Sequence, residues 1–229
     1  MKKKTFIAFG ILVAFFVLQS CSSNPEKTLL SRYFNAVSMN DNATMASMAL
    51  EPAQWDLGSW QIVSVSAEKI EPLVLADLNK KELDAKKAQD TQIGPTMDAD
   101  TILANAKDEL DLARSAGAKV DAKKKIEVAQ ANYDTEYAKM KEYKKAYSDA
   151  KAAAAAEEQA TLFSLGLREL PTIRDLTGNV HSKDVVVKVT TKQGQVKTYR
   201  LPMRMYEMKS ETGQRLPSRW VITRFEPVA

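Results

Sequence analysis

The sequence contains one cysteine, Cys21, and one histidine, His181. A single cysteine excludes an internal disulfide framework. A metal site needs several clustered Cys, His or acidic ligands, and the sequence has no such cluster. It also lacks a Gly-rich phosphate loop, a nucleophile elbow and a paired-carboxylate motif. These absences argue against the common enzyme and cofactor classes, so we expect no enzymatic activity, no cofactor and no metal.

Only one long apolar run is present, over residues 6–18, and it follows three consecutive lysines. It is shorter than the roughly 20 residues of a membrane-spanning helix and is typical of a signal-peptide core. It ends in Leu18-Gln19-Ser20-Cys21, which resembles the lipobox of bacterial lipoproteins. That resemblance implies a signal peptide over 1–20 and a lipid, such as palmitate, on Cys21. The alternatives are an ordinary cleaved signal or an anchor helix with an incidental cysteine.

The same resemblance implies a location in the bacterial cell envelope. Ser22 follows Cys21, where an Asp would retain an enterobacterial lipoprotein in the inner membrane. We therefore expect a lipid-anchored outer-membrane protein that faces the periplasm, because two or more acyl chains hold a protein stably. Without residues 1–20, which carry three lysines and no acid, the formal charge falls from +4 by three to about +1. This balance gives no electrostatic reason to expect nucleic acid binding.

Aromatic residues and helix breakers are scarce in a long middle zone. No Phe lies between Phe34 and Phe163, and the zone is rich in Ala, Lys and Glu, which favour helices. The flanks hold most of the aromatic residues, the β-branched runs and the turn signals. This division predicts a discontinuous α+β domain, 21–71 plus 166–229, split by an inserted helical hairpin over 72–165.

The two flanks predict helices followed by strands. Apolar residues between Leu29 and Val37 have the spacing of a buried helical stripe, and Asn40-Asp41-Asn42 ends that helix and caps the next. Alternating patterns with short connections predict an antiparallel meander of strands at 60–67, 185–190, 199–205 and 220–225. The predicted fold class is α+β: N-terminal helices packed on a curved antiparallel sheet of about four strands, interrupted by a long α-helical coiled-coil hairpin.

The middle zone has the heptad spacing of a coiled-coil seam. Five residues fall seven apart in its second half: Ile126, Tyr133, Met140, Tyr147 and Ala154. In the first half a 3-then-4 spacing starts at Leu103 and breaks between residues 116 and 121, beside Gly117. We expect a hairpin that bends there, with arms over 72–115 and 121–165 and an interruption at Gly94-Pro95. The alternative is a single helix through Gly117 that follows a turn at Gly94-Pro95.

The first flank also carries a family resemblance. Tyr33-Phe34-Asn35-Ala36, then Asp41, Ala43 and Met45, outline an aromatic helix, a break and a second short helix. This pattern resembles the nuclear-transport-factor-2-like (NTF2-like) families, which have the cystatin-like cone fold and include small bacterial lipoproteins. The likeness covers 25–71 and 166–229, and the insertion departs from it. It implies a fold and no function, because this fold hosts enzymes, ligand binders and interaction modules.

Several residues are candidates for a functional role. Tyr133, Tyr137, Tyr143 and Tyr147 form a stripe that is a possible partner-contact surface, although several of them would instead pack the seam. Methionines would line an apolar cavity in the cone or fill a packed core: Met45, Met48, Met203, Met205 and Met208. His181 is interpreted as an ordinary loop histidine near Asp175 and Asp184. Asp98 and Asp100 are interpreted as first-turn acids of a helix rather than a calcium site.

These patterns favour a membrane-anchored, non-enzymatic envelope lipoprotein. The hairpin would act as a structural or protein-interaction module that contacts another envelope protein or a second copy of the chain. The alternative is a small-molecule or lipid-binding protein that uses the cone of the α+β domain.

Overall fold

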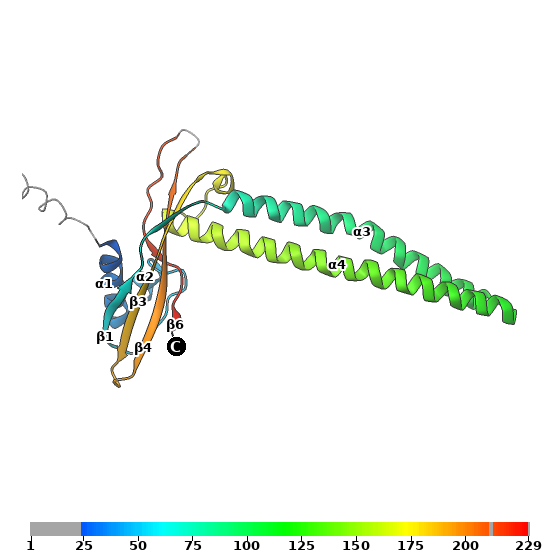
Figure 1. Cartoon of the computed structure of the whole chain (residues 1–229), viewed down its shortest axis with the longest axis horizontal. Helices are drawn as coiled ribbons and strands as arrows, with labels where there is room; N and C mark the ends of the chain where they lie inside the picture. The colour runs from blue at the N-terminus through cyan, green and yellow to red at the C-terminus, as the bar shows by residue number, and fades with distance from the viewer. Residues whose placement is uncertain (1–23, 211–212, 229) are drawn as a thin grey trace, which may run out of the picture. The chain divides into compact units, whose positions relative to one another are not determined.

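The computed structural model describes residues 24–210 and 213–228. The predicted signal peptide and Cys21 lie outside this part of the chain. Within it the fold is α+β, with a long helical region and an open antiparallel sheet of six strands (Figure 1). The described residues form two units: the first comprises 24–68, 182–204 and 220–228, and the second comprises 69–181, 205–210 and 213–219.

The first unit begins with two helices whose starts the sequence predicts correctly, although the second is shorter than expected. Helix α1 (Pro25–Ser38) starts with a proline, which suits the first turn because its missing N–H needs no partner there. Helix α2 (Asn42–Ala46) is capped by Asp41, whose carboxylate accepts a hydrogen bond from the Thr44 amide at 3.0 Å. Asn40, between them, has a φ of 54°.

The sheet is built around two long strands, β3 (Gly178–Thr191) and β4 (Val196–Met208). β1 (Leu57–Val65) pairs with β3, and β5 (Val221–Ile222) pairs with β4, which gives the order β1-β3-β4-β5. β2 (Lys69–Pro72) also pairs with β3, and β6 (Glu226–Val228) also pairs with β4.

The prediction of about four strands was therefore too low. β2 is exposed along its whole length, so it has no apolar alternation that would reveal it in the sequence. The expected strand over 220–225 is found only as the short β5, opposite Met203 and Arg204, and a further strand that was not expected, β6, follows it opposite residues 198–200. Pro202 lies between these two paired segments. A proline has no N–H to add to a ladder, so it fits where the pairing is interrupted.

The core of the first unit is made of large side chains. Val185, Val187 and Val189 alternate inward on β3 and are at most 1% exposed, as the sequence pattern predicts. They belong to one buried cluster with Tyr33, Phe34 and other residues of α1 and α2. The Phe34 ring stacks on Trp60 with 4.7 Å between ring centroids. The α1 and α2 residues and the β3 valines thus share one apolar core.

The second unit contains the two longest helices, α3 (Leu75–Leu112) and α4 (Ala116–Leu165), and the 3-10 turn η1 (Ile173–Asp175). α3 and α4 run side by side in opposite directions and are joined by residues 113–115 (Figure 1). We call α3, α4 and this turn the hairpin. Of the two predicted bends, the structure has the one near Gly117, shifted toward the N-terminus. The shift has a local cause, because the Ser115 hydroxyl accepts from the Ala118 amide at 3.1 Å and caps α4.

Of the kink or short break expected at Gly94-Pro95, the short break is wrong. α3 continues through Pro95 as one helix, and the packing of the helix pair outweighs the backbone hydrogen bond that the proline removes. Asp98 and Asp100 consequently lie in the interior of α3 and not in a first turn, so their interpretation as first-turn acids is also wrong. Among the described residues, no helix is long and apolar enough to cross a membrane.

Candidate interaction surface

The facing sides of α3 and α4 form a seam of mostly small or polar residues. Near the turn, Leu103, Ala106 and Ala129 are buried, and Ile126 and Tyr133 pack against them. Seven-residue steps from Leu103 along α3 reach Thr96, Gln89 and Glu82 in one direction and Leu110 in the other. Alanine at the contact lets two helices approach closely, and it buries little apolar surface.

A polar layer crosses the middle of the seam. The Gln92 side-chain amide of α3 donates to the Glu136 carboxylate of α4 at 2.5 Å, and Thr96 donates to the Glu136 carbonyl at 3.4 Å. Lys139 forms an ion pair with the same carboxylate at 2.8 Å. The Lys139 and Gln92 hydrogen bonds hold the pKa of Glu136 below its usual value. A polar layer of this kind fixes the register of two helices, since a slip would leave its groups unpaired.

A second charged cluster lies at the end of the hairpin away from the turn. Arg174 of η1 forms ion pairs with Glu82 of α3 at 2.8 Å and with Glu158 of α4 at 2.7 Å. It also donates to the Asn79 side chain at 3.3 Å. The hydrogen bond to Glu158 is the main cause of the raised pKa of Arg174. One guanidinium therefore joins both helices, and no sequence pattern predicts this contact because the partners lie far apart in the chain.

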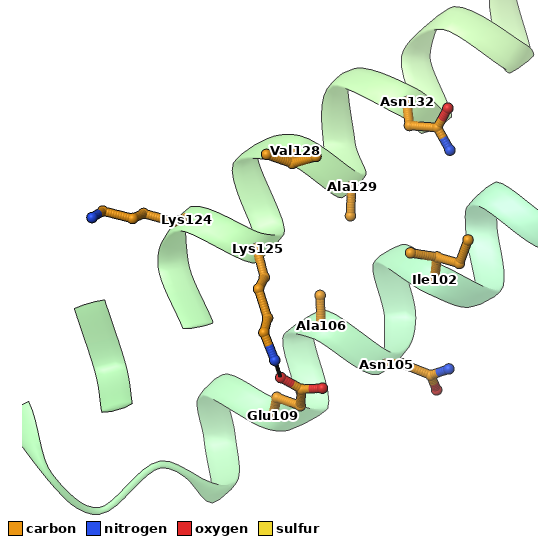
Figure 2. Close-up of a pocket in the computed structure, with 9 residues that line it drawn as sticks. All are labelled: Ile102, Asn105, Ala106, Glu109, Lys124, Lys125, Val128, Ala129 and Asn132. Atoms are coloured by element: carbon orange, nitrogen blue, oxygen red, sulfur yellow. Dashed lines mark hydrogen bonds and ion pairs between the residues drawn. The ribbon is translucent and has the colours of Figure 1, made fainter. Parts of the chain in front are cut away.

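A groove of about 590 Å³ runs between the helices close to the turn (Figure 2). In Figure 2 the side chains of Ala106 and Ala129 point toward each other across it. Lys125 of α4 bridges to Glu109 of α3 at 2.5 Å. The other residues lining the groove are Ile102, Asn105, Lys124, Val128 and Asn132.

Two apolar residues that line this groove are exposed to solvent. Ile102 is 53% exposed and Val128 is 72% exposed, and Leu112, beyond the groove toward the turn, is 78% exposed. Ile102 and Glu109 directly precede the seam residues Leu103 and Leu110, so they lie on the same side of α3. Apolar side chains on the outer surface of a charged helix pair are the usual mark of a binding surface. We call this side of the hairpin, from Ile102 to Leu112 and from Lys124 to Asn132, the groove face.

The predicted tyrosine stripe is divided between the seam and the surface. Tyr133 packs against the buried cluster and stacks on Tyr137 with 5.6 Å between ring centroids. Tyr137 and Tyr143 are 42% and 40% exposed, and Lys141 lies 4.4 Å from the Tyr137 ring centroid. Tyr147 is partly buried, with Lys151 at 6.0 Å from its ring centroid. The four residues therefore do not form one continuous surface, and their role in partner contact stays a prediction.

The other candidate residues occupy ordinary structural positions. His181 lies inside β3 and not in a loop; its side chain is 12% exposed, with Nε2 3.1 Å from the Glu207 carboxylate. Arg215 approaches the same carboxylate at 3.4 Å. Met45, Met48 and Met203 belong to the core of the first unit and are at most 4% exposed. Met208 is buried in the second unit and Met205 is partly buried, so the five methionines do not line one cavity.

Within residues 24–210 and 213–228, no group of three or more His, Cys, Asp or Glu side chains is arranged to hold a metal ion. No protein-family model matches the chain, and the searches of curated proteins and of solved structures found no match either. The interpretation of the molecule therefore rests on its own residues.

Sequence reasoning missed the groove face, although a signal for it was present. The seam spacing assigns Leu103, Leu110, Ile126 and Tyr133 to the interior. Ile102, Leu112 and Val128 fall outside that spacing and are apolar residues with no place in the seam. Apolar residues left over from a heptad pattern indicate a second contact surface, and they lie on one side of the hairpin.

Proposed function

We propose that this protein is a non-enzymatic lipoprotein of a bacterial envelope whose hairpin binds another protein molecule. The observation that carries the proposal is the groove face, where exposed apolar side chains border a groove with an ion pair across it. Such a surface suits a partner helix, because apolar ridges fill the groove and rim charges fix the orientation. The charged clusters around Glu136 and Arg174 are structural, since each joins α3 to α4.

The anchor belongs to the same proposal. The lipobox residues Leu18-Gln19-Ser20-Cys21 support attachment of acyl chains to Cys21 and a place in the outer membrane facing the periplasm. The test is metabolic labelling with a palmitate analogue, followed by separation of inner and outer membranes. The wild-type chain should carry label and sediment with outer membranes. A Cys21→Ser chain should lose the label, and retention of the label in that variant would refute lipidation at this residue.

We further propose that the first unit has the curved, helix-packed arrangement of the NTF2-like families. The shared core of Tyr33, Phe34, Met45 and the β3 valines supports it. The fold itself assigns no chemistry, so the hairpin remains the element on which the function rests.

The binding role is tested by photo-crosslinking in living cells. A photoreactive amino acid replaces Val128 on the groove face or, as a control, Ala138, an exposed residue of the same helix outside the groove face. We expect a discrete crosslinked protein product from residue 128 and little or none from residue 138. A chain that is produced and folded but yields no product at 128, at Ile102 or at Leu112 would contradict a binding role for the hairpin.

A further inference from the structure

We propose that the partner of the groove face is a second copy of this chain, and that two hairpins associate side by side with their turns pointing in the same direction. This inference rests on the proposed function and names its partner. A two-fold axis along the hairpins would place α3 of one copy on α4 of the other and create a four-helix bundle. Symmetric pairs are the commonest protein assemblies, and they require a surface that is complementary to itself.

The shape of the groove face meets this requirement. It carries a hollow with a floor of Ala106 and Ala129, and apolar ridges formed by Ile102 on α3 and Val128 on α4. The proposed symmetry keeps the height along the axis, so Ile102 of one copy lies opposite the part of α4 near Asn132 in the other. Val128 likewise lies opposite the part of α3 near Ala106. The apolar ridges of each copy therefore pack into the hollow of the other copy.

The charges of the two helices are also complementary in this arrangement. Of the residues that line the groove, Glu109 of α3 is acidic, whereas Lys124 and Lys125 of α4 are basic. Packing α3 on the partner's α4 brings the acidic end of one copy onto the basic end of the other. The alternative is a two-fold axis perpendicular to the hairpins, which places α3 on α3 with the turns pointing in opposite directions. That arrangement would bring acidic residues against acidic ones and basic residues against basic ones, which weakens binding. The charge pattern therefore selects the orientation with turns in the same direction.

The size of the surface predicts a weak dimer that membrane anchoring favours. The groove spans residues 102–109 of α3 and 124–132 of α4, about two helical turns, which is small beside a standard interface of roughly 1,600 Å². Molecules anchored in one membrane have a raised effective concentration, so a weak contact is populated there. Hairpins with turns in the same direction suit two chains that are anchored in the same bilayer.

The Glu109–Lys125 pair allows a test in trans. Full-length chains with two different affinity tags are produced together in one cell, solubilised in mild detergent and isolated through the first tag; the second tag is then measured. Glu109→Lys gives four positive charges around the axis in a homodimer, and Lys125→Glu gives four negative charges. Each single variant should co-isolate with itself roughly tenfold less than wild type, because like charges oppose association. A mixture of one E109K chain and one K125E chain restores opposite charges across both contacts and should recover co-isolation.

Two further variants serve as controls. Val128→Asp should abolish co-isolation, and Ala138→Asp, which places the same charge outside the groove face, should leave it unchanged. Helicity by circular dichroism shows that each variant is folded. Failure of the mixed pair to exceed the single variants would overturn the proposal, and so would a wild-type chain that does not co-isolate with itself. If residue 128 nevertheless crosslinks to a different protein in cells, the proposed function stands and the dimer alone is refuted.

Discussion

The core of the first unit and the seam of the hairpin are stabilised in different ways. The first unit buries Tyr33, Phe34, Leu30 and the β3 valines, and partly buried Trp55 and Trp60 pack against them. The hairpin seam instead holds alanines and a Gln–Glu layer, with one small apolar cluster around Leu103. A large side chain gives about 1.5–3 kcal/mol on burial, and an alanine gives much less. The hairpin is therefore long but weakly held per residue, and it leaves apolar side chains outside its seam for a partner.

The two regions also treat polar groups differently. In the first unit the Tyr33 hydroxyl accepts from the Ala53 amide at 2.9 Å and donates to the Ala53 carbonyl at 3.0 Å, with no charge involved. In the hairpin, carboxylates and cations carry the specific contacts, as at Glu136 and Arg174. The first unit also holds a charged contact, Lys183 of β3 with Glu26 of α1 at 3.4 Å, so the contrast concerns the aromatic core around Tyr33 and not the whole unit. An uncharged hydrogen bond suits that core, whereas charged layers set the register of helices that are otherwise free to slide.

The sequence provides separate probes for the two regions. All three tryptophans of the chain, Trp55, Trp60 and Trp220, lie in the first unit. Most of the helix belongs to α3 and α4, which have 38 and 50 residues. Tryptophan fluorescence therefore follows the first unit, and the circular dichroism signal at 222 nm follows mainly the hairpin.

The largest effect is expected from Phe34→Ala in the first unit. The Phe34 side chain is 1% exposed and contacts Tyr33, Trp55 and Trp60 by ring-to-ring packing. Removing a buried aromatic ring costs about 3–5 kcal/mol. The fluorescence midpoint in urea should fall sharply. Met39→Ala, at the C-cap of the same helix, is the control because Met39 is 77% exposed. It should change the free energy of unfolding by less than about 0.5 kcal/mol. A Phe34→Ala chain with a wild-type midpoint would contradict this account of the core.

The sequence predicts most of the fold of the first unit because its signals are local. Pro25 and Asp41 mark the helix starts, and Val185–Val189 shows the alternation of a half-buried strand. Face changes within strands are harder to predict. On β4 the buried residues are first the odd-numbered Leu201 and Met203 and then the even-numbered Tyr206 and Met208. The change from odd to even positions occurs where the strand passes from one unit to the other. Simple alternation assigned Met205 to the wrong face, because it assumes one core along the whole strand.

The hairpin shows the limits of pattern reasoning more clearly. The heptad spacing identified Ile126 and Tyr133 as seam residues, and the structure confirms that they pack there. The break expected at Gly94-Pro95 did not occur, since tertiary packing overrides the local preference of proline. The groove face could have been suspected from Ile102 and Val128, but its ion pair depends on the register of α3 against α4. That register follows from contacts such as Gln92–Glu136, 44 residues apart in the chain, which no local pattern reveals.

The second effect in size is expected from Leu103→Ala in the hairpin. Leu103 is 4% exposed in a cluster of small neighbours, so its loss removes most of the apolar contact near the turn. We expect a loss of about 2–3 kcal/mol, measured as a lower midpoint in the 222 nm signal. The fluorescence midpoint should move less, which is the reverse of the Phe34→Ala result. The neighbouring Ile102→Ala is the matched control, because Ile102 is half exposed and outside the seam. Equal shifts of both probes in every variant would show that the two regions unfold as one.

The smallest effect at neutral pH is expected from Tyr33→Phe, and the difference from wild type shrinks in alkali. Burial raises the pKa of Tyr33 to about 12, against an ordinary value of 10.0. The unfolded chain loses the phenol proton near pH 10 and the folded chain only near pH 12, so the wild-type first unit loses stability as the pH rises through this window. Two pKa units correspond to about 2–3 kcal/mol by pH 12.

The Tyr33→Phe chain lacks this group. At pH 7 it should be less stable than wild type by about 1 kcal/mol, the usual net value of a lost hydrogen bond. Between pH 10 and 12 its fluorescence midpoint should fall less steeply than that of wild type, so the two curves converge. Tyr137→Phe, at an exposed tyrosine of the hairpin, is the control and should keep the wild-type slope. A Tyr33→Phe slope identical to wild type would mean that the Tyr33 phenol ionises as easily in the folded chain as in the unfolded one. The conclusion that the core of the first unit holds Tyr33 in its uncharged form would then be withdrawn.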